Sequence, residues 1–290
     1  MSYYLYNNDL KVGKGNFNLP PLLIGTIFYD GETIIDRDDP LNFSIEKAKK
    51  RINAHKELAA KYKLPEMVEI TASDPSAMKE YIKFYLDNYD LPFVLGGNFE
   101  ARKAGIEFLN QEGVPPTDYI YNAISNLKNQ EELELIKTNN IETVVILMLS
   151  SENMTSTQRY SNLTKKTQPG NTSIVQGIKN LGVERIWVDG GVINLESLAH
   201  ILETQQLISE SLKLPVGTAP GLFLFKYSSP RLNKKFHTRY RRASIMALAS
   251  WFSNFIFYGA IEDATECFSS VHQAYEFKEI IKDKNISFLD

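Results

Sequence analysis

Polar side chains lie within or at the end of several short apolar runs in this sequence. Glu69 lies in MVEIT, Asn122 in YIYNA and Asp189 at the end of RIWVD. A carboxylate can accept two parallel hydrogen bonds from an N–H and a neighbouring NH2 group, and an amide can both donate and accept. Together the three residues predict a site that holds a flat heterocycle by an amide–guanidine edge, such as the edge of a pterin.

A structural role is the alternative for each of these residues. Carboxylates and amides at strand ends also satisfy the backbone of neighbouring loops. The turns Gly96-Gly97-Asn98 and Asp189-Gly190-Gly191 are ambiguous in a similar way. Paired glycines suit a phosphate-binding turn, but an ordinary tight turn is the commoner cause.

Other kinds of site are excluded by what the chain does not contain. It has one cysteine, Cys267, and four histidines, which show no His-x-x-x-His spacing. A zinc site and a disulfide framework are therefore not expected, and no metal is predicted in this chain. The sequence also contains no P-loop, no G-x-S-x-G turn and no G-x-G-x-x-G turn.

A basic segment, residues 226–242, reads KYSSPRLNKKFHTRYRR and contains no acidic residue. A run of this kind is usually a solvated loop that leads into a helix. In a chain of net negative charge it also suits an anionic tail of a substrate or an acidic partner protein. Arg239 is the candidate contact in this segment.

The elements that must position these residues alternate short apolar runs with longer amphipathic stretches. Continuous apolar runs of four to eight residues are typical of strands buried on both faces, as in a parallel sheet. The predicted strands are Leu22–Phe28, Met67–Thr71, Pro92–Leu95, Tyr119–Ala123, Val144–Leu149, Arg185–Asp189, Leu214–Gly217 and Phe255–Tyr258. The predicted helices are residues 45–62, 76–89, 100–112, 130–138, 173–181, 195–212, 239–252 and 264–284.

Eight strand–helix units in order predict a closed (β/α)8 barrel, the TIM barrel, with an open doubly wound sheet as the alternative. We expect residues 1–290 to form one domain, with residues 1–21 as an N-terminal β-hairpin that plugs the bottom of the barrel. Segments 150–172 and 226–238 follow strands and are long and polar. They are expected to be irregular loops on the upper rim, where such barrels keep their sites.

Composition limits the class of protein. Of 290 residues 43% are hydrophobic, and the net charge is -3. A general nucleic-acid or membrane-surface binder is not expected at this charge. The N-terminus has no apolar signal region, and the most apolar stretch, residues 244–260, is too short and too interrupted to span a membrane. The expectation is a soluble cytoplasmic protein without direct membrane insertion.

An ordered set of motifs resembles a known family over nearly the whole chain. No single motif is diagnostic. The set is LLIGTIFYDGETII, LPEMVEITASDPSAMKEYIKF, LPFVLGGNFEARKA, DYIYNAISN, GVERIWVDGGV, LPVGTAPG and FIFYGAIEDA. It is similar to the H subunit of tetrahydromethanopterin S-methyltransferase and its stand-alone relatives, which resemble the methyltetrahydrofolate–corrinoid methyltransferases.

The resemblance implies a (β/α)8 barrel, commonly a homodimer, that binds a reduced pterin (tetrahydromethanopterin or tetrahydrofolate) in its mouth. The implied reaction moves a methyl group between pterin N5 and the cobalt of a corrinoid carried by a separate protein. Neither a metal nor S-adenosylmethionine is implied in this chain. The candidate catalytic residues are Asp189, Asn122 and Asn98, and the candidate substrate contacts are Glu69, Asn122, Asp189, Ser150, Gly217 and Arg239.

The sequence departs from the family pattern at several positions. Glu69 and Gly96 stand where the resemblance implies aspartates, and Leu222 where it implies an asparagine that reaches pterin N5. A Gly190-Gly191 pair replaces a more usual Thr-Ala pair. Two alternatives follow. The chain is a non-catalytic subunit that binds a pterin or docks on a corrinoid protein, or it is a methyltransferase with a different substrate, either a more apolar methyl donor or another heterocycle.

Overall fold

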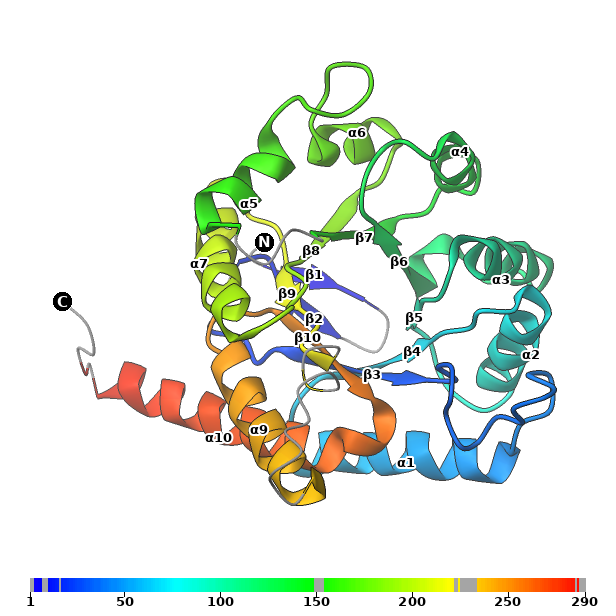
Figure 1. Ribbon diagram of the computed structural model, residues 1–290, viewed down its shortest axis with the longest axis horizontal. Helices are drawn as coiled ribbons and strands as arrows, with labels where there is room; N and C mark the ends of the chain where they lie inside the picture. The colour runs from blue at the N-terminus through cyan, green and yellow to red at the C-terminus, as the bar shows by residue number, and fades with distance from the viewer. Residues whose placement is uncertain are drawn as a thin grey trace.

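The computed structural model describes residues 3–6, 10–15, 17–148, 154–221, 224, 234–284 and 286. Eight parallel strands close into a barrel in the order β10-β3-β4-β5-β6-β7-β8-β9, and helices surround the ring (Figure 1). The predicted (β/α)8 barrel is confirmed, and the open-sheet alternative is wrong.

The strands have the positions expected from the apolar runs. They are β3 (Leu22–Ile27), β4 (Glu66–Ile70), β5 (Phe93–Leu95), β6 (Tyr119–Ile124), β7 (Thr143–Leu147), β8 (Arg185–Asp189), β9 (Val216–Thr218) and β10 (Phe255–Ala260). The longer helices are α1 (Ile45–Tyr62), α2 (Pro75–Leu86), α3 (Phe99–Gln111), α4 (Gln130–Thr138), α5 (Ser156–Thr164), α6 (Ile174–Asn180), α7 (Leu195–Leu212), α9 (Lys234–Ala249) and α10 (Ala264–Asp283).

Alternation along the strands decides which side chains face the barrel interior. The inner core cluster contains Leu22, Ile24, Met67, Val94, Ile120, Val145, Trp187, Phe255 and Phe257. Successive side chains of a strand point to opposite faces, so a residue two positions further along points inward again. That rule places Glu69 above Met67, Asn122 above Ile120 and Asp189 above Trp187, all on the inner wall at the carboxyl ends of their strands.

Short polar signals start the helices that follow. Ser44 accepts a hydrogen bond from the Lys47 N–H at the start of α1, and Asp74 accepts one from the Ala77 N–H at the start of α2. Each bond satisfies an N–H that would otherwise have no partner in the first helical turn. The N-terminal caps fix where each helix leaves the rim.

The N-terminal hairpin closes the lower end of the barrel. Strands β1 (Tyr3–Leu5) and β2 (Lys11–Gly13) pair antiparallel. The Trp187 indole N–H donates to the Tyr6 hydroxyl at 3.0 Å, and Tyr6 and Val12 belong to the inner core cluster. In the view of Figure 1 the hairpin lies within the outline of the ring of strands. The predicted N-terminal hairpin is confirmed.

Two rim segments are more regular than we expected. Helix α5 lies within segment 150–172, and α9 begins at Lys234, five residues before the predicted start at Arg239. A capping box at Thr155 and Gln158 starts α5, because each side chain bonds the backbone N–H of the other. The expectation of wholly irregular loops is therefore wrong at residues 156–164 and 234–238.

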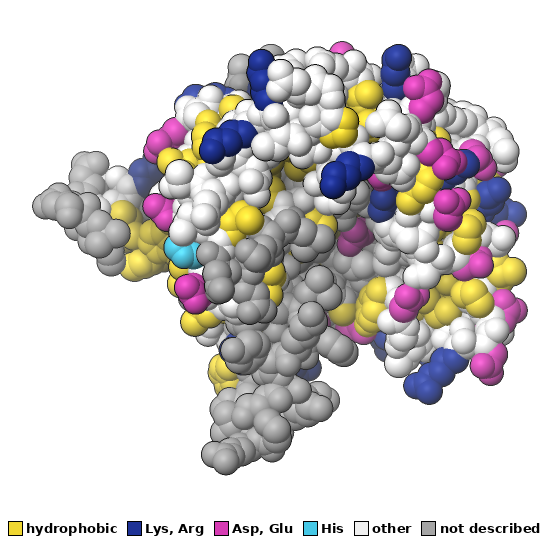
Figure 2. Space-filling view, turned by 45° about the horizontal axis from the view of Figure 1, so that its top comes forward, with side chains coloured by type: hydrophobic (Ala, Val, Ile, Leu, Met, Phe, Trp, Pro, Cys, Tyr) yellow, Lys and Arg dark blue, Asp and Glu magenta, His cyan; other side chains and the backbone are white. Residues whose placement is uncertain are grey.

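The surface agrees with the small net charge. On the face shown in Figure 2, basic and acidic side chains are interspersed over the described part of the molecule. None of the described helices is both long and apolar enough to cross a membrane.

Candidate functional site

A cavity of about 450 Å³ opens at the carboxyl ends of the barrel strands. Glu69, Asn122 and Asp189 all line it, although they come from β4, β6 and β8. The three residues named first from the sequence therefore converge on one cavity. The rest of the wall comes largely from β3, β10 and the segments that follow them, and comprises Thr26, Tyr29, Asp30, Ala219, Gly221, Arg242, Phe257, Tyr258, Gly259, Ala260 and Asp263.

Glu69 is oriented by two hydrogen bonds. Its Oε2 atom accepts from the Thr26 hydroxyl at 2.6 Å, and its Oε1 atom accepts from the Asn122 amide Nδ2 at 2.6 Å. Burial raises the pKa of Glu69, and the two hydrogen bonds and the charge of Arg102 oppose that shift. Each carboxylate oxygen has a second lone pair, so Glu69 can still accept a hydrogen bond from a ligand.

Asp189 is almost fully buried, with 3% of its surface exposed. Its Oδ1 atom accepts from the Gly191 N–H at 2.9 Å. Burial raises the pKa of Asp189 to about 7, and the negative charge of Glu69 adds to the shift, while the N–H groups of Gly191 and Ala219 lower it. Near neutral pH the side chain therefore exchanges readily between carboxylate and carboxylic acid.

Gly96 makes the room that Glu69 occupies. A Cβ atom at this glycine would lie 2.5 Å from Glu69 Oε1, which is closer than real Cβ atoms approach, and 3.0 Å from Cδ. The departures from the family pattern at these two positions are thus physically linked. The longer side chain at 69 fills space that a side chain at 96 would need.

One wall of the cavity is held by ion pairs. Arg242 of α9 contacts Asp263 at 2.6 Å and Glu266 at 2.9 Å, and the Tyr29 hydroxyl donates to Glu262 at 2.5 Å. Burial raises the pKa of Asp263 to about 6, and the charge of Arg242 opposes the shift. These contacts tie the short 3₁₀ turn η3 (Ile261–Asp263) to α9 on one side and to the loop after β3 on the other.

Asn98, Gly217 and Arg239 do not line this cavity. Asn98 caps α3: its Oδ1 accepts from the Ala101 N–H at 2.9 Å and its Nδ2 donates to the Ser73 carbonyl at 2.7 Å. Gly217 is paired in register with Asp189, and its space is filled by the Phe255 ring. Arg239 is largely exposed and lies 3.8 Å from Glu266. Ser150 and Leu222 lie outside the described residues.

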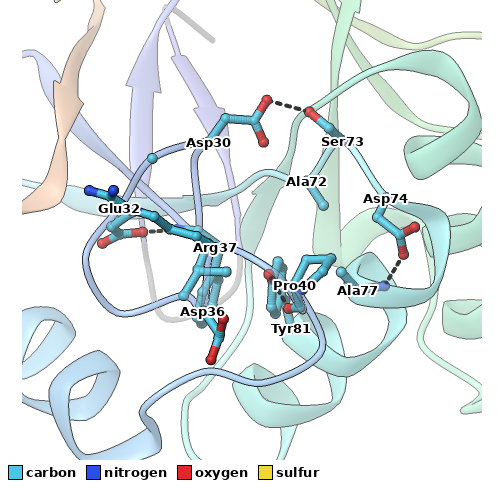
Figure 3. Close-up of a pocket in the computed structure, with 13 residues that line it drawn as sticks. Asp30, Glu32, Asp36, Arg37, Pro40, Ala72, Ser73, Asp74, Ala77 and Tyr81 are labelled. Carbon is cyan, nitrogen blue, oxygen red and sulfur yellow. Dashed lines mark hydrogen bonds between the residues drawn. The ribbon is translucent and has the colours of Figure 1, made fainter.

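A second cavity of about 430 Å³ adjoins the first at Asp30, which lines both. Its wall comes from the loop after β3 and from the start of α2. Figure 3 shows Asp30 and Ser73 meeting across the gap between the two loops, with a hydrogen bond of 2.7 Å from the serine hydroxyl to Oδ2. Asp36 and Asp74 also line this cavity, together with Arg37. The side of the mouth near Asp30 is therefore mostly acidic. Residues 226–233 of the basic segment lie outside the described residues.

The sequence does not predict that residues of β3 and β10 line the cavity. Thr26 is a hydroxyl residue near a strand end, but only the structure shows that it donates to Glu69. Arg242 and Asp263 carried only generic signals, a basic run and an acidic helix start. Within the described ranges no group of histidine, cysteine and carboxylate side chains could hold a metal ion.

Comparisons with known proteins agree with this architecture. The family model described as "Tetrahydromethanopterin S-methyltransferase MtrH subunit" matches residues 8–287. The H subunit of tetrahydromethanopterin S-methyltransferase from Methanothermobacter marburgensis is 30% identical over 138 residues, which is 47% of this chain and 44% of that protein. The corresponding protein from Methanosarcina acetivorans is 21% identical over 273 residues, which is 90% of this chain and 86% of that protein. The chain spans about half the length of the first of these relatives.

Solved structures with the same fold include dihydropteroate synthases. The Coxiella burnetii enzyme in complex with pteroic acid superposes with a TM-score of 0.61 at 12% identity, covering 97% of this chain and all of that chain. A Yersinia pestis dihydropteroate synthase with a sulfonamide drug gives a TM-score of 0.63 at 10% identity, covering 96% of this chain and 99% of that chain. At these identities the likeness shows the barrel fold alone.

Proposed function

We propose that this chain, which belongs to the MtrH family of tetrahydromethanopterin S-methyltransferase subunits, transfers a methyl group between N5 of a reduced pterin and a corrinoid protein. The observation that carries the proposal is the convergence of Glu69, Asn122 and Asp189 on one cavity at the mouth of the barrel. The names of the relatives, which are methyltransferase subunits, support the same reaction class. The corrinoid partner, a homodimeric assembly and a cytoplasmic location are proposals that rest on the resemblance.

Glu69, Asn122 and Asp189 form the floor of the cavity, and their hydrogen-bond donors and acceptors suit the pterin ring. Asp189 would accept two parallel hydrogen bonds from the N–H and NH2 groups of the guanidine edge. Glu69 would accept a further bond through its remaining lone pairs, and Asn122 would fix Glu69. The cavity volume of about 450 Å³ falls within the roughly 300–1,000 Å³ usual for small-molecule sites.

The reaction requires the protein to help N5 leave the methyl group and to orient the pterin ring. The corrinoid would supply the cobalt that exchanges the methyl group. As the N5–methyl bond breaks, its electron pair returns to N5, so a proton or a hydrogen bond must reach that nitrogen. A buried pocket strengthens such contacts and keeps competing water out. The side chains of the floor would orient the ring so that N5 and its methyl group face the open mouth of the barrel.

The test is an anaerobic assay with the full chain, Co(I) cobalamin, and methyl-tetrahydromethanopterin or methyl-tetrahydrofolate. Methyl-cobalamin formation that depends on the protein and on the pterin is the expected result. Calorimetry on the same pterins separates the alternatives. Binding without turnover would indicate a non-catalytic subunit. If neither pterin binds and neither is turned over, the proposal is contradicted and a different methyl donor is favoured.

Pterin affinity is expected to depend on pH through Asp189. The ionised carboxylate accepts the two N–H bonds, whereas the acid must first lose its proton. Because the pKa of Asp189 in the free protein is about 7, the Kd should weaken by about tenfold per pH unit below that value and level off above it. Calorimetry across about pH 5.5 to 8.5 would check this. A Kd that stays constant over the range would exclude the role assigned to Asp189.

A further inference from the structure

A buried arginine lies directly behind the floor of the cavity. Arg102 is on the first turn of α3, and only 8% of its surface is exposed. Its Nη2 atom donates to Glu132 Oε1 of α4 at 2.6 Å, and the same oxygen accepts from the Tyr121 hydroxyl at 2.6 Å. The guanidinium also lies 4.8 Å from the centre of the Tyr121 ring. Arg102 therefore joins α3, β6 and α4 on the outer side of the barrel wall.

The same guanidinium contacts the backbone of two segments that neighbour Glu69, one following β5 and the other in β6. Its Nη1 atom donates to the Gly97 carbonyl and, at 3.4 Å, to the Asn122 carbonyl. Gly97 follows Gly96, the glycine whose missing Cβ leaves room for Glu69. Asn122 is the residue whose amide donates to Glu69 Oε1. One side chain thus fixes the two backbone segments that shape the position of Glu69.

We propose that Arg102 is a positioning residue for the ligand-binding floor, acting by bridging the Gly97 and Asn122 carbonyls so that Asn122 and Glu69 stay aligned for the ring. This inference rests on the proposed function for its ligand, but its geometry does not. A planar guanidinium presents several donors in a fixed arrangement, and a lysine ammonium cannot reproduce that bridge. The positive charge also favours the ionised form of Glu69, which is the form that accepts hydrogen bonds.

The chain provides a matched control next to Arg102. Lys103 forms an ion pair with Glu131, and this pair also joins α3 to α4. Both of its side chains are substantially exposed, at 35% and 58%, and neither residue lines the cavity. Loss of this pair tests whether a weaker contact between α3 and α4 changes the Kd by itself, and R102K tests the loss of the bridge with the positive charge kept.

The first experiment measures ligand affinity. Variants R102K, R102M and K103M of the full chain would be compared with the parent by calorimetry with methyl-tetrahydrofolate and methyl-tetrahydromethanopterin. We expect the Kd to rise at least about tenfold for R102M, and for R102K by a similar factor because the bridge is lost. K103M should retain the parental Kd. Parental affinity in the folded fraction of both Arg102 variants would overturn the proposal, whatever happens to their Tm.

The second experiment needs no ligand. Carbon NMR of the labelled glutamate carboxyl groups, with the Glu69 signal assigned by its loss in E69Q, would follow the titration of Glu69 in each free protein. Removal of the charge in R102M should move this titration to higher pH, and R102K should stay close to the parent. An unshifted Glu69 titration in R102M would also overturn the proposal. If the parent binds no pterin but the Glu69 titration moves to higher pH in R102M, the proposed function is contradicted and the positioning role of Arg102 is supported.

Discussion

Replacement of Asp189 by asparagine is expected to weaken pterin binding at least about a hundredfold. The carboxylate is buried at the floor of the cavity, where it can accept two bonds from the guanidine edge. Hydrogen bonds to a charged group contribute about 1.5–3 kcal/mol each, so loss of the pair accounts for that factor. The Asn amide would also direct an NH2 group at a ligand NH2 group, leaving two donors face to face. Methyl transfer should fall at least in parallel.

The same replacement should not lower the thermal stability of the free protein. Burial raises the pKa of Asp189 from 3.8 to about 7 on folding. Its contribution to stability is complete below the unfolded pKa and is lost as pH rises through about 7. Above that pH the folded protein bears the full cost of an ionised buried carboxylate, and asparagine does not. The Asn Oδ1 atom can still accept from the Gly191 N–H.

Thermal unfolding at about pH 8 would test this, with a Tm for D189N equal to or above that of the parent. A suitable control is D74N. Asp74 caps α2 on the same rim, and asparagine caps helices as well as aspartate does. That variant should keep both the parental Tm and the parental Kd. A large fall in Tm for D189N would indicate that Asp189 serves the loop backbone, which was the structural alternative.

The sequence predicts that Glu69, Asn122 and Asp189 converge, because two simple periodicities determine where they lie. Buried parallel strands appear as apolar runs, and alternation along each run assigns the inward face. Glu69, Asn122 and Asp189 follow inward-facing residues by two positions, so their convergence follows once the barrel closes. Gly217 is paired with Asp189 at the same level, but it packs against Phe255 and does not line the cavity.

The failures have equally specific causes. Asn98 is a preferred helix-capping residue at a helix start, and that local use competes with any role toward a ligand. Helix α5 is not predicted from the sequence, because STQRYSNLT has few apolar residues to show a helical period. The available signal was the capping box of Thr155 and Gln158. Arg102 could not be found from the sequence, because its partners Gly97, Asn122 and Glu132 meet only in the folded chain.

The space at Gly96 distinguishes two interpretations of the departures from the family pattern, a degraded site and a rearranged site. The resemblance implies aspartates at both 69 and 96, and the chain instead has a longer acid at 69 and no side chain at 96. A lost function would leave the space at Gly96 empty. The structure fills it with the Glu69 carboxylate, which two hydrogen bonds hold in place. This arrangement supports a compensated floor and predicts a strong coupling between the two positions.

Replacement of Gly96 by alanine is therefore expected to weaken pterin binding at least about tenfold. The new Cβ atom would lie 2.5 Å from Glu69 Oε1, so the carboxylate must shift, which weakens its bonds to Thr26 and Asn122. The E69D variant should also bind weakly, because the shorter side chain cannot reach both partners. In the double variant the shorter acid relieves the contact with the alanine. The loss of affinity of the double variant should therefore be clearly smaller than the product of the two single losses. Calorimetry on the four proteins gives the coupling directly. Independent, multiplicative effects would mean that Glu69 does not depend on the space at Gly96, and the compensated floor would then be ruled out.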